Sequence, residues 1–301
     1  MRRYLALVVV AGVITLLFFQ SMPLYERWKF KKLGQDEIEL MAGPPMVSTT
    51  AGEARRTVSI LFLGASYIYF NHMPRMLVEI ASSDLANDTK IEVQKYTRGG
   101  VNLDQLWKLE AARMPLLSRR WDYVVLQQQS FWALSSSMVQ ETVDVTDRMQ
   151  PYFQKAGARP VIMVSWARQP GSHWYTDERT RFTGSAAYMQ QQFDTKSLEL
   201  ADHLGGVAVP VGDFWAFALQ VDPALPLYGP DGSHPSIAGS YLTALVFYRF
   251  LVRGSPAHTN YAPEGLSPLL ADQLRRIAST PLAAVTTQPE WLSYESGSHA
   301  R

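Results

Sequence analysis

The chain has 301 residues, a formal net charge of +1 and no cysteine. Hydrophobic residues make up 47% and charged residues 18%, which is typical of a folded globular protein and excludes a largely disordered chain. The near-neutral charge, with no basic block in the body, leaves no electrostatic case for nucleic-acid binding. Without cysteine there is no disulfide, thiol nucleophile or thiolate metal site.

The amino terminus is predicted to be a membrane anchor. Arg2 and Arg3 precede an apolar run over residues 4–19, and the run extends to residue 25, which is long enough to cross a bilayer. No small-residue cleavage site follows, so residues 1–25 favour an uncleaved signal anchor or transmembrane helix over a cleaved signal peptide. Basic residues flank the run on both sides, and the orientation therefore stays open.

Residues 26–56 contain glycine, proline and threonine clusters and are predicted to be a linker. From residue 57 onward, short apolar runs alternate with amphipathic segments, which predicts one parallel α/β sheet with helices on both faces. We expect this domain to cover residues 57–254 and a carboxyl-terminal extension to cover residues 255–301. The predicted strands are 57–63, 91–96, 123–127, 160–165 and 207–209, and the predicted helices are 73–86, 103–117, 138–155, 185–203, 236–251 and 269–277.

The first candidate for chemistry follows the strand at residues 57–63. This apolar run stops at Gly64, where the lack of a side chain lets the backbone turn sharply. Ser66 then lies at the carboxyl end of a strand, which is the edge where open α/β sheets bind their ligands. Its hydroxyl is a candidate nucleophile, and the alternative is an ordinary loop serine, because Gly-x-Ser is common in turns.

A glycine pair follows the second predicted strand. Gly99 and Gly100 allow close backbone approach and leave N–H groups uncovered, as a site that binds an oxyanion requires. The alternative is an ordinary turn that leads into a helix capped by Asn102.

Three glutamines follow the third predicted strand. One of the amides at this sheet edge is a candidate donor to a developing negative charge, and a simple polar turn is the alternative. Because side chains alternate in direction along a strand, Gln127 and Gln129 face the same way, and either residue fits the role.

The last candidate segment precedes the helix at residues 236–251. Asp231 and Gly232 are typical of a turn, and Pro235 is typical of a helix start. That interpretation leaves His234 unexplained. A carboxylate three residues before a histidine, held in a rigid turn, can accept the imidazole N–H and support the imidazolium that forms. Such a pair can activate a serine for acyl transfer.

The segment after the fourth strand is a candidate lid or sugar-binding wall, because its aromatic residues and Arg168 suit carbohydrate contact. The candidate substrate-binding residues are Gln127, Trp166 and Arg168. No histidine or carboxylate spacing indicates a metal site, and no glycine-rich phosphate loop is present, so neither a metal nor a cofactor is predicted.

The order of these features says more than any one of them. Serine after the first strand, glycine after the second, an amide after the third and Asp-x-x-His before the last large helix resemble the SGNH (GDSL-like) hydrolase superfamily. The resemblance covers residues 57–251 and is strongest to the branch with Gly-Asn-Ser in its first block and Leu-Gln-x-Gln-Ser in its third. The matching stretches are residues 63–66, 99–100, 125–130, 165–168 and 231–236.

This resemblance implies a fold and a set of site residues. The fold is a three-layer α/β/α sandwich around a central parallel five-stranded sheet of flavodoxin-like order. Ser66 matches the nucleophile, His234 the general base and Asp231 its orienting acid. The family holds the oxyanion with the nucleophile's own N–H, a glycine N–H and an asparagine side chain, and here Gly100 matches the glycine.

The chain departs from the family pattern at two positions. Ala65 replaces the usual Asp or Asn, outside the path of proton transfer, so we expect little loss. Gln129 stands where the family has asparagine and is one methylene longer, and Gln127 remains its rival as the side-chain oxyanion donor.

The sequence thus predicts a membrane-anchored SGNH-type serine esterase with its domain in the periplasm or otherwise outside the cytoplasm. The expected substrate is an acyl ester, such as an acetyl ester, of a carbohydrate or another small molecule. One alternative is an O-acetyltransferase that modifies an envelope polysaccharide. Another is a protein of the same fold that binds carbohydrate without catalysis, although the presence of Ser66, Asp231 and His234 together speaks against it.

Overall fold

The computed structural model describes residues 44–176 and 184–286, which lie within one compact unit, Ala42–Arg301. The predicted anchor at residues 1–25 lies outside the described residues. In the part described, no helix has the length and apolar character needed to span a membrane. The strands are β1 (Met46–Val47), β2 (Arg56–Gly64), β3 (Thr89–Thr97), β4 (Tyr123–Leu126), β5 (Arg159–Met163) and β6 (Val207–Val209).

These strands form one mixed sheet in the order β1-β3-β2-β4-β5-β6. The strands from β2 to β6 pair in parallel, and their order along the sheet is the flavodoxin-like one. β1 adds a sixth, antiparallel strand at the edge, with Met46 opposite Val93. The prediction of a purely parallel five-stranded sheet was therefore wrong at this edge. A two-residue strand has no periodicity to read, and this one falls inside the predicted linker.

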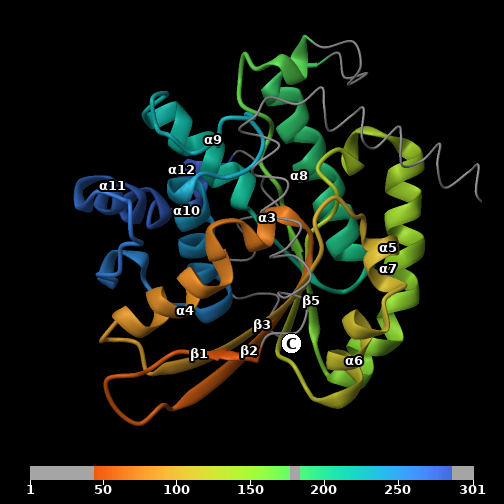
Figure 1. Ribbon diagram of the computed structural model, residues 1–301, viewed down its shortest axis with the longest axis horizontal. Coiled ribbons are helices and arrows are strands. Elements are labelled where there is room, and N and C mark those ends of the chain that lie inside the picture. Colours follow the sequence, from red (N-terminus) through yellow and green to blue (C-terminus); the bar gives the residue numbers. More distant parts are fainter. Residues whose placement is uncertain (1–43, 177–183, 287–301) are drawn as a thin grey trace, which may run out of the picture. The chain divides into compact units, whose positions relative to one another are not determined.

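Ten α-helices are described beside the sheet. Figure 1 shows α4 and α10 on one side of it and α7 and α8 on the other. Strands covered on both faces must be apolar on both, and β2 is buried continuously from Val58 to Gly64. The helices are α3 (Ser66–Tyr69), α4 (Met73–Ser83), α5 (Leu103–Trp107), α6 (Glu110–Ser118), α7 (Ser136–Ala156), α8 (Ala186–His203), α9 (Val211–Val221), α10 (Ile237–Phe247), α11 (Pro268–Ala278) and α12 (Leu282–Val285).

Two helical predictions differ from the structure. The helix predicted over residues 103–117 is divided into α5 and α6, because Leu109 between them has extended backbone. The sequence reading missed α9, which is largely apolar and is buried at Phe214, Trp215 and Ala218. A helix with little polar surface lacks the 3.6-residue alternation that reveals an amphipathic one.

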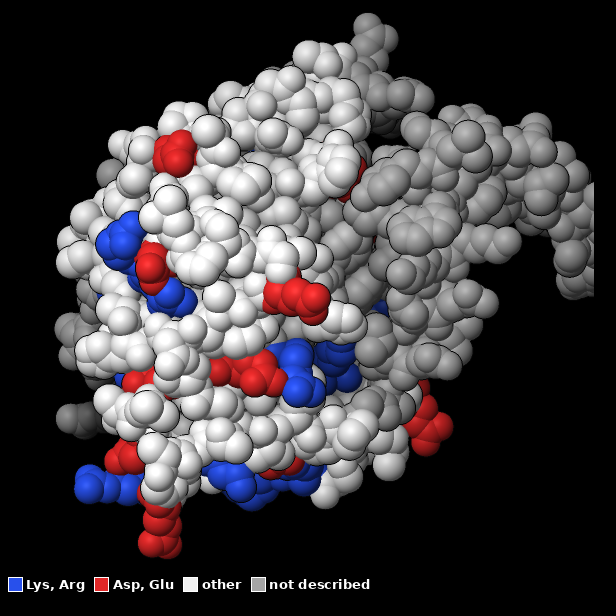
Figure 2. All heavy atoms as spheres, turned by 60° about the vertical axis from the view of Figure 1, so that its left-hand side comes forward, with Lys and Arg blue, Asp and Glu red and all other residues white. Residues whose placement is uncertain are grey.

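On the face in Figure 2, acidic and basic side chains are interspersed, and neither sign dominates.

Candidate active site

The turn after β2 places Ser66 at the first position of α3. The Gln127 side chain, which follows β4, lies against this turn, and its Oε1 accepts the Ala65 N–H at 2.7 Å. A Cβ on Gly64 would lie 2.8 Å from Gln127 Cβ and 2.9 Å from its Oε1, so only glycine fits there. The turn that carries the serine is therefore fixed by packing as well as by its own backbone.

The segment before α10 brings a histidine and a carboxylate to Ser66. His234 Nε2 is 2.9 Å from Ser66 Oγ, and His234 Nδ1 is 2.5 Å from Asp231 Oδ2. All three residues are partly buried at the carboxyl edge of the sheet. The structure thus joins the three predicted triad residues in one hydrogen-bonded chain, with the geometry in which a histidine can take a proton from a serine.

The backbone of this segment holds the carboxylate in place. Asp231 Oδ1 accepts the N–H groups of Ser233 at 3.0 Å and His234 at 2.9 Å, so both carboxylate oxygens are engaged. Gly232 has φ +65°, a conformation that glycine adopts without strain. Trp174 Nε1 donates to the Asp231 carbonyl at 2.7 Å and ties the loop to the segment after β5.

These contacts also set the charge state of the carboxyl group. Burial alone would raise the pKa of Asp231, but the hydrogen bond and charge of His234, together with the two backbone N–H groups, outweigh burial. The pKa of Asp231 is held well below its ordinary value. The group is a carboxylate at neutral pH, as support of a neighbouring imidazolium requires.

Aromatic residues from the nucleophile's own segment pack on the imidazole ring. Phe70 stacks on His234 with ring centroids 4.3 Å apart, and Tyr67 packs against it in a T-shaped arrangement with centroids 5.6 Å apart. Asn71, at φ +52°, donates from Nδ2 to the carbonyl of Pro235 at 3.0 Å. The sequence reading missed Tyr67, Phe70 and Asn71, and their only signal was their closeness to Ser66 along the chain.

The candidate oxyanion donors lie at the ends of three adjacent strands. Gly64 pairs with Thr97, and Leu63 pairs with Leu126, so Ser66, Gly100 and Gln129 all stand just beyond the same edge. The N–H of Ser66 opens α3 and lacks an acceptor within the helix. Gly100 and Gln129 are exposed, and the Gln129 amide makes no hydrogen bond with a described residue.

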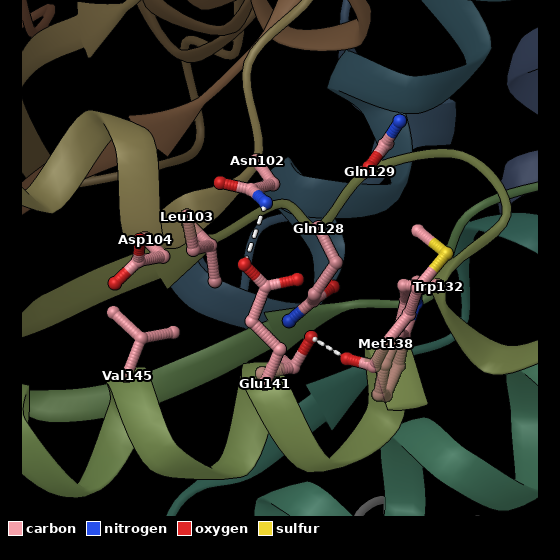
Figure 3. A pocket seen from close by; sticks show the side chains of 10 residues that line it. Asn102, Leu103, Asp104, Gln128, Gln129, Trp132, Met138, Glu141 and Val145 are labelled. Carbon is pink, nitrogen blue, oxygen red and sulfur yellow. Dashed lines mark hydrogen bonds between the residues drawn. The ribbon is translucent and has the colours of Figure 1, made fainter. Parts of the chain in front are cut away.

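The three glutamines after β4 have different environments. Gln127 is buried, and besides holding Ala65 it donates from Nε2 to the carbonyl of Gln128. Gln128 extends into a pocket beside Glu141, and Gln129 also lines this pocket, with its amide directed away from Glu141 (Figure 3). Of the two rivals, only Gln129 has an uncommitted amide, and this favours it as the side-chain donor.

Two predicted substrate-binding residues are buried beneath the site. Trp166 is 1% exposed and stacks between Tyr67 and Trp215. Arg168 is 4% exposed, with the rings of Phe131 and Trp174 packed over it. Gln127, the third, is fastened to the serine turn. Burial leaves these side chains little surface for direct substrate contact, and the sequence does not show depth below the surface.

Two other histidines lie at helix ends: His72 is the N-cap of α4, and His203 ends α8 beside Asp147. Within residues 44–176 and 184–286, no group of three or more histidine or carboxylate side chains gathers where it could hold a metal ion.

No family model and no curated protein matches the sequence, but solved structures do. A presumed SGNH hydrolase from Slackia heliotrinireducens is 28% identical, with a TM-score of 0.53, over 66% of this chain and 100% of its own. A DUF4886 family protein from Bacteroides uniformis is 16% identical, with a TM-score of 0.61, over 74% and 93%. A mutant of Axe2, an acetyl-xylooligosaccharide esterase from Geobacillus, is 13% identical, with a TM-score of 0.50, over 70% and 100%.

The sheet order, the block order and the 28% identical structure agree on one class of protein. The solved structures that resemble this chain support an SGNH-like hydrolase superfamily. The similarity to the 28% identical structure supports an enzyme of the general hydrolase class. The two more distant structures support the fold alone.

Proposed function

We propose that the chain is a serine esterase that cleaves acyl esters through an acyl-serine intermediate on Ser66. One observation carries the proposal: the hydrogen-bonded chain from Asp231 through His234 to Ser66, with distances of 2.5 and 2.9 Å. An orienting acid, a base and a hydroxyl in this sequence are the arrangement that nucleophilic acyl transfer needs.

In the first half-reaction, Ser66 Oγ attacks the ester carbonyl carbon while His234 Nε2 accepts the hydroxyl proton. Asp231 accepts the hydrogen bond from Nδ1–H and stabilises the imidazolium. The tetrahedral oxyanion takes hydrogen bonds from Ser66 N–H, Gly100 N–H and the Gln129 amide. The carbon–oxygen bond to the alcohol then breaks, and His234 returns its proton to the leaving oxygen.

In the second half-reaction, water replaces the alcohol. His234 takes one proton from the water as its oxygen attacks the acyl-serine, and the same donors hold the second oxyanion. Collapse releases the carboxylic acid and returns the proton to Ser66. A sugar hydroxyl in place of water would make the same site an O-acyltransferase.

We propose an acetyl ester of a carbohydrate as the substrate class. Trp174 donates to the Asp231 carbonyl, and its indole lies 4.7 Å from the exposed His173 ring, so aromatic surface stands beside the triad. Rings placed this way suit the apolar face of a sugar. Axe2 is by its name an acetyl-xylooligosaccharide esterase, and it shares the fold.

We also propose that residues 1–25 anchor the protein and that the domain acts in the periplasm or elsewhere outside the cytoplasm. The apolar run supports the anchor. Basic residues flank it on both sides, so the side of the membrane is decided by experiment. Protease protection in cells that express the full chain would test the location.

The function is tested by hydrolysis of p-nitrophenyl acetate by the purified full-length chain beside its Ser66→Ala variant. Activity that the substitution abolishes is the expected result. Weak Ser66-dependent release that rises with added oligosaccharide would instead indicate the transferase. A folded protein that hydrolyses nothing and binds sugar as well as Ser66→Ala does would overturn the proposal in favour of a non-catalytic role.

A further inference from the structure

Arg168 is a buried cation without a carboxylate partner in the described part of the chain. Its Nη1 donates to the Tyr67 hydroxyl at 2.7 Å, and its Nη2 donates to Ser130 Oγ at 2.6 Å. The rings of Phe131 and Trp174 lie 4.7 and 4.4 Å from the guanidinium carbon, and Nε has no hydrogen-bond partner. Burying a charge without a counter-ion is costly, so stability alone does not account for this residue.

The hydrogen bonds of Arg168 lead to the triad. The Tyr67 hydroxyl is 2.8 Å from Ser233 Oγ, and Ser233 stands between Asp231 and His234 in the chain. Ser233 N–H donates to the Asp231 carboxylate, and the Ser233 carbonyl accepts from Trp166 Nε1 at 3.0 Å. Arg168 is thus linked through the Tyr67 hydroxyl to Ser233, the residue between Asp231 and His234.

The other end of the guanidinium reaches the oxyanion side. Ser130 follows Gln129, the candidate side-chain donor, in the loop after β4. Arg168, which follows β5, therefore bonds directly to α3 and to the loop after β4, and it reaches the loop before α10 through Tyr67. A forked, planar cation with several donors suits this task better than a lysine, which has a single point charge.

We propose that Arg168 is a positioning residue of the triad, which holds Ser233, and with it the Asp231–His234 turn, in register with Ser66 through the Tyr67 hydroxyl. This inference rests on the proposed esterase function. This role differs from substrate binding. Aromatic rings cover the Arg168 guanidinium and the side chain is buried, so little room is left for a ligand.

Kinetics of the purified full-length chain test the proposal. Arg168→Met and Tyr67→Phe each remove the Arg168–Tyr67 bond and keep the bulk of the side chain. We expect each to lower kcat on the order of 10- to 100-fold with KM nearly unchanged, because a shift of about 1 Å in a catalytic group costs that much. The double variant should be no slower than the slower single variant, because both act on one path.

Two further variants serve as controls. Ser130→Ala removes the other Arg168 bond and leaves the path to Ser233 intact, so it tests the oxyanion side alone, and kcat should fall less than in Arg168→Met. Arg168→Lys keeps the charge without the fork and should recover only part of the activity. Thermal melting checks that each variant folds, and if Arg168→Met does not, Tyr67→Phe and Arg168→Lys carry the test.

A second readout does not depend on any ester being cleaved. Nitrogen-15 NMR of the full-length chain in detergent follows the His234 Nδ1–H resonance, which reports its bond to Asp231. The resonance should shift in Arg168→Met and Tyr67→Phe and stay in place in Ser130→Ala. If wild type shows no Ser66-dependent hydrolysis, the esterase proposal fails, and this spectrum still decides the positioning role.

Three results would overturn the proposal. A folded Arg168→Met with unchanged kcat and an unchanged His234 resonance removes the positioning role. A rise in KM of tenfold or more with constant kcat indicates substrate contact instead. Multiplicative losses in the double variant show that Arg168 and Tyr67 act independently.

Discussion

The two sides of the site differ in how firmly the described residues hold them. On the proton-transfer side, Asp231 engages both carboxylate oxygens, and His234 bonds through both ring nitrogens. On the oxyanion side, Gly100 is exposed at φ +71°, with open space around it, and the Gln129 amide has no partner among the described residues. The proton-transfer side is therefore a closed side, complete in the free protein. The oxyanion side is an open side, which presents its donors to solvent.

This difference follows from what each side must do. A proton moves between groups that belong to the protein, so their geometry can be built into the fold. An oxyanion exists only while substrate reacts, so its donors must stay unpaired until then. Substitutions should therefore affect the two sides differently, and the following predictions test that.

The largest effect is expected from Asp231→Asn on the closed side. Asparagine keeps an oxygen for the two backbone N–H groups but cannot accept from His234 as a carboxylate does. We expect kcat to fall on the order of 10⁴-fold, because the imidazole loses its orientation and the support of its charge. Ester hydrolysis and thermal melting measure the two consequences. An unchanged melting temperature with near-normal kcat would remove Asp231 from the mechanism.

The open side is tested by Gln129→Ala against Gln127→Ala. Loss of one oxyanion donor lowers kcat on the order of 100- to 1000-fold, and the exposed Gln129 should cost no stability. Gln127→Ala leaves the buried Ala65 N–H unpaired, so we expect a loss of about 1–3 kcal/mol in unfolding free energy and a smaller fall in kcat. Equal and small effects on kcat would argue against the assignment of Gln129.

Gln190 holds the segment after β5, which packs beneath the closed side. Its side chain accepts the Ala167 N–H and donates to the Ser165 carbonyl and to Asp194. Asp194 and Asp213 are each 6% exposed and lie together between α8 and α9. Burial raises the pKa of both groups, and for Asp194 the charge of Asp213 adds to it.

This pair gives a pH-dependent stability of known sign. Because their pKa values are higher in the folded chain, it binds more protons than the unfolded chain, and their contribution is lost as the pH rises above the usual range of an aspartate. We expect the unfolding free energy to fall by about 1–3 kcal/mol from mildly acidic to alkaline pH. Urea unfolding at several pH values measures it. Asp194→Asn should flatten the profile, and an equally steep profile in that variant would exclude the pair as its source.

The smallest effect is expected from Gly232→Ala in the triad loop. A side chain at φ +65° is strained by roughly 1 kcal/mol, and its Cβ would lie 3.2 Å from Ser172 Cβ. Stability should fall by about that amount, and kcat should fall severalfold, because the carboxylate and imidazole share this turn. Gly205→Ala, also at positive φ but away from the site, is the matched control and should leave kcat unchanged.

Local rules made much of the protein predictable. The β2 strand that ends in glycine and serine, the alternation of strands and helices, and the turn that carries Asp231 and His234 each follow from contacts within a few residues. Their order along the chain suffices to place them at one sheet edge, because parallel strands all end there.

Long-range packing decided the rest. The sequence by itself determined which residue types stand at the edge of the sheet, since this depends on backbone direction and spacing. Only the tertiary structure distinguished Gln127, which bonds to the serine turn, from the exposed Gln129. It also showed that Arg168 and Trp166, where the sequence suggested substrate contact, are buried beneath the site. It also added β1 at the sheet edge. Depth, side-chain partners and edge pairing depend on residues distant in the chain, and no local pattern records them.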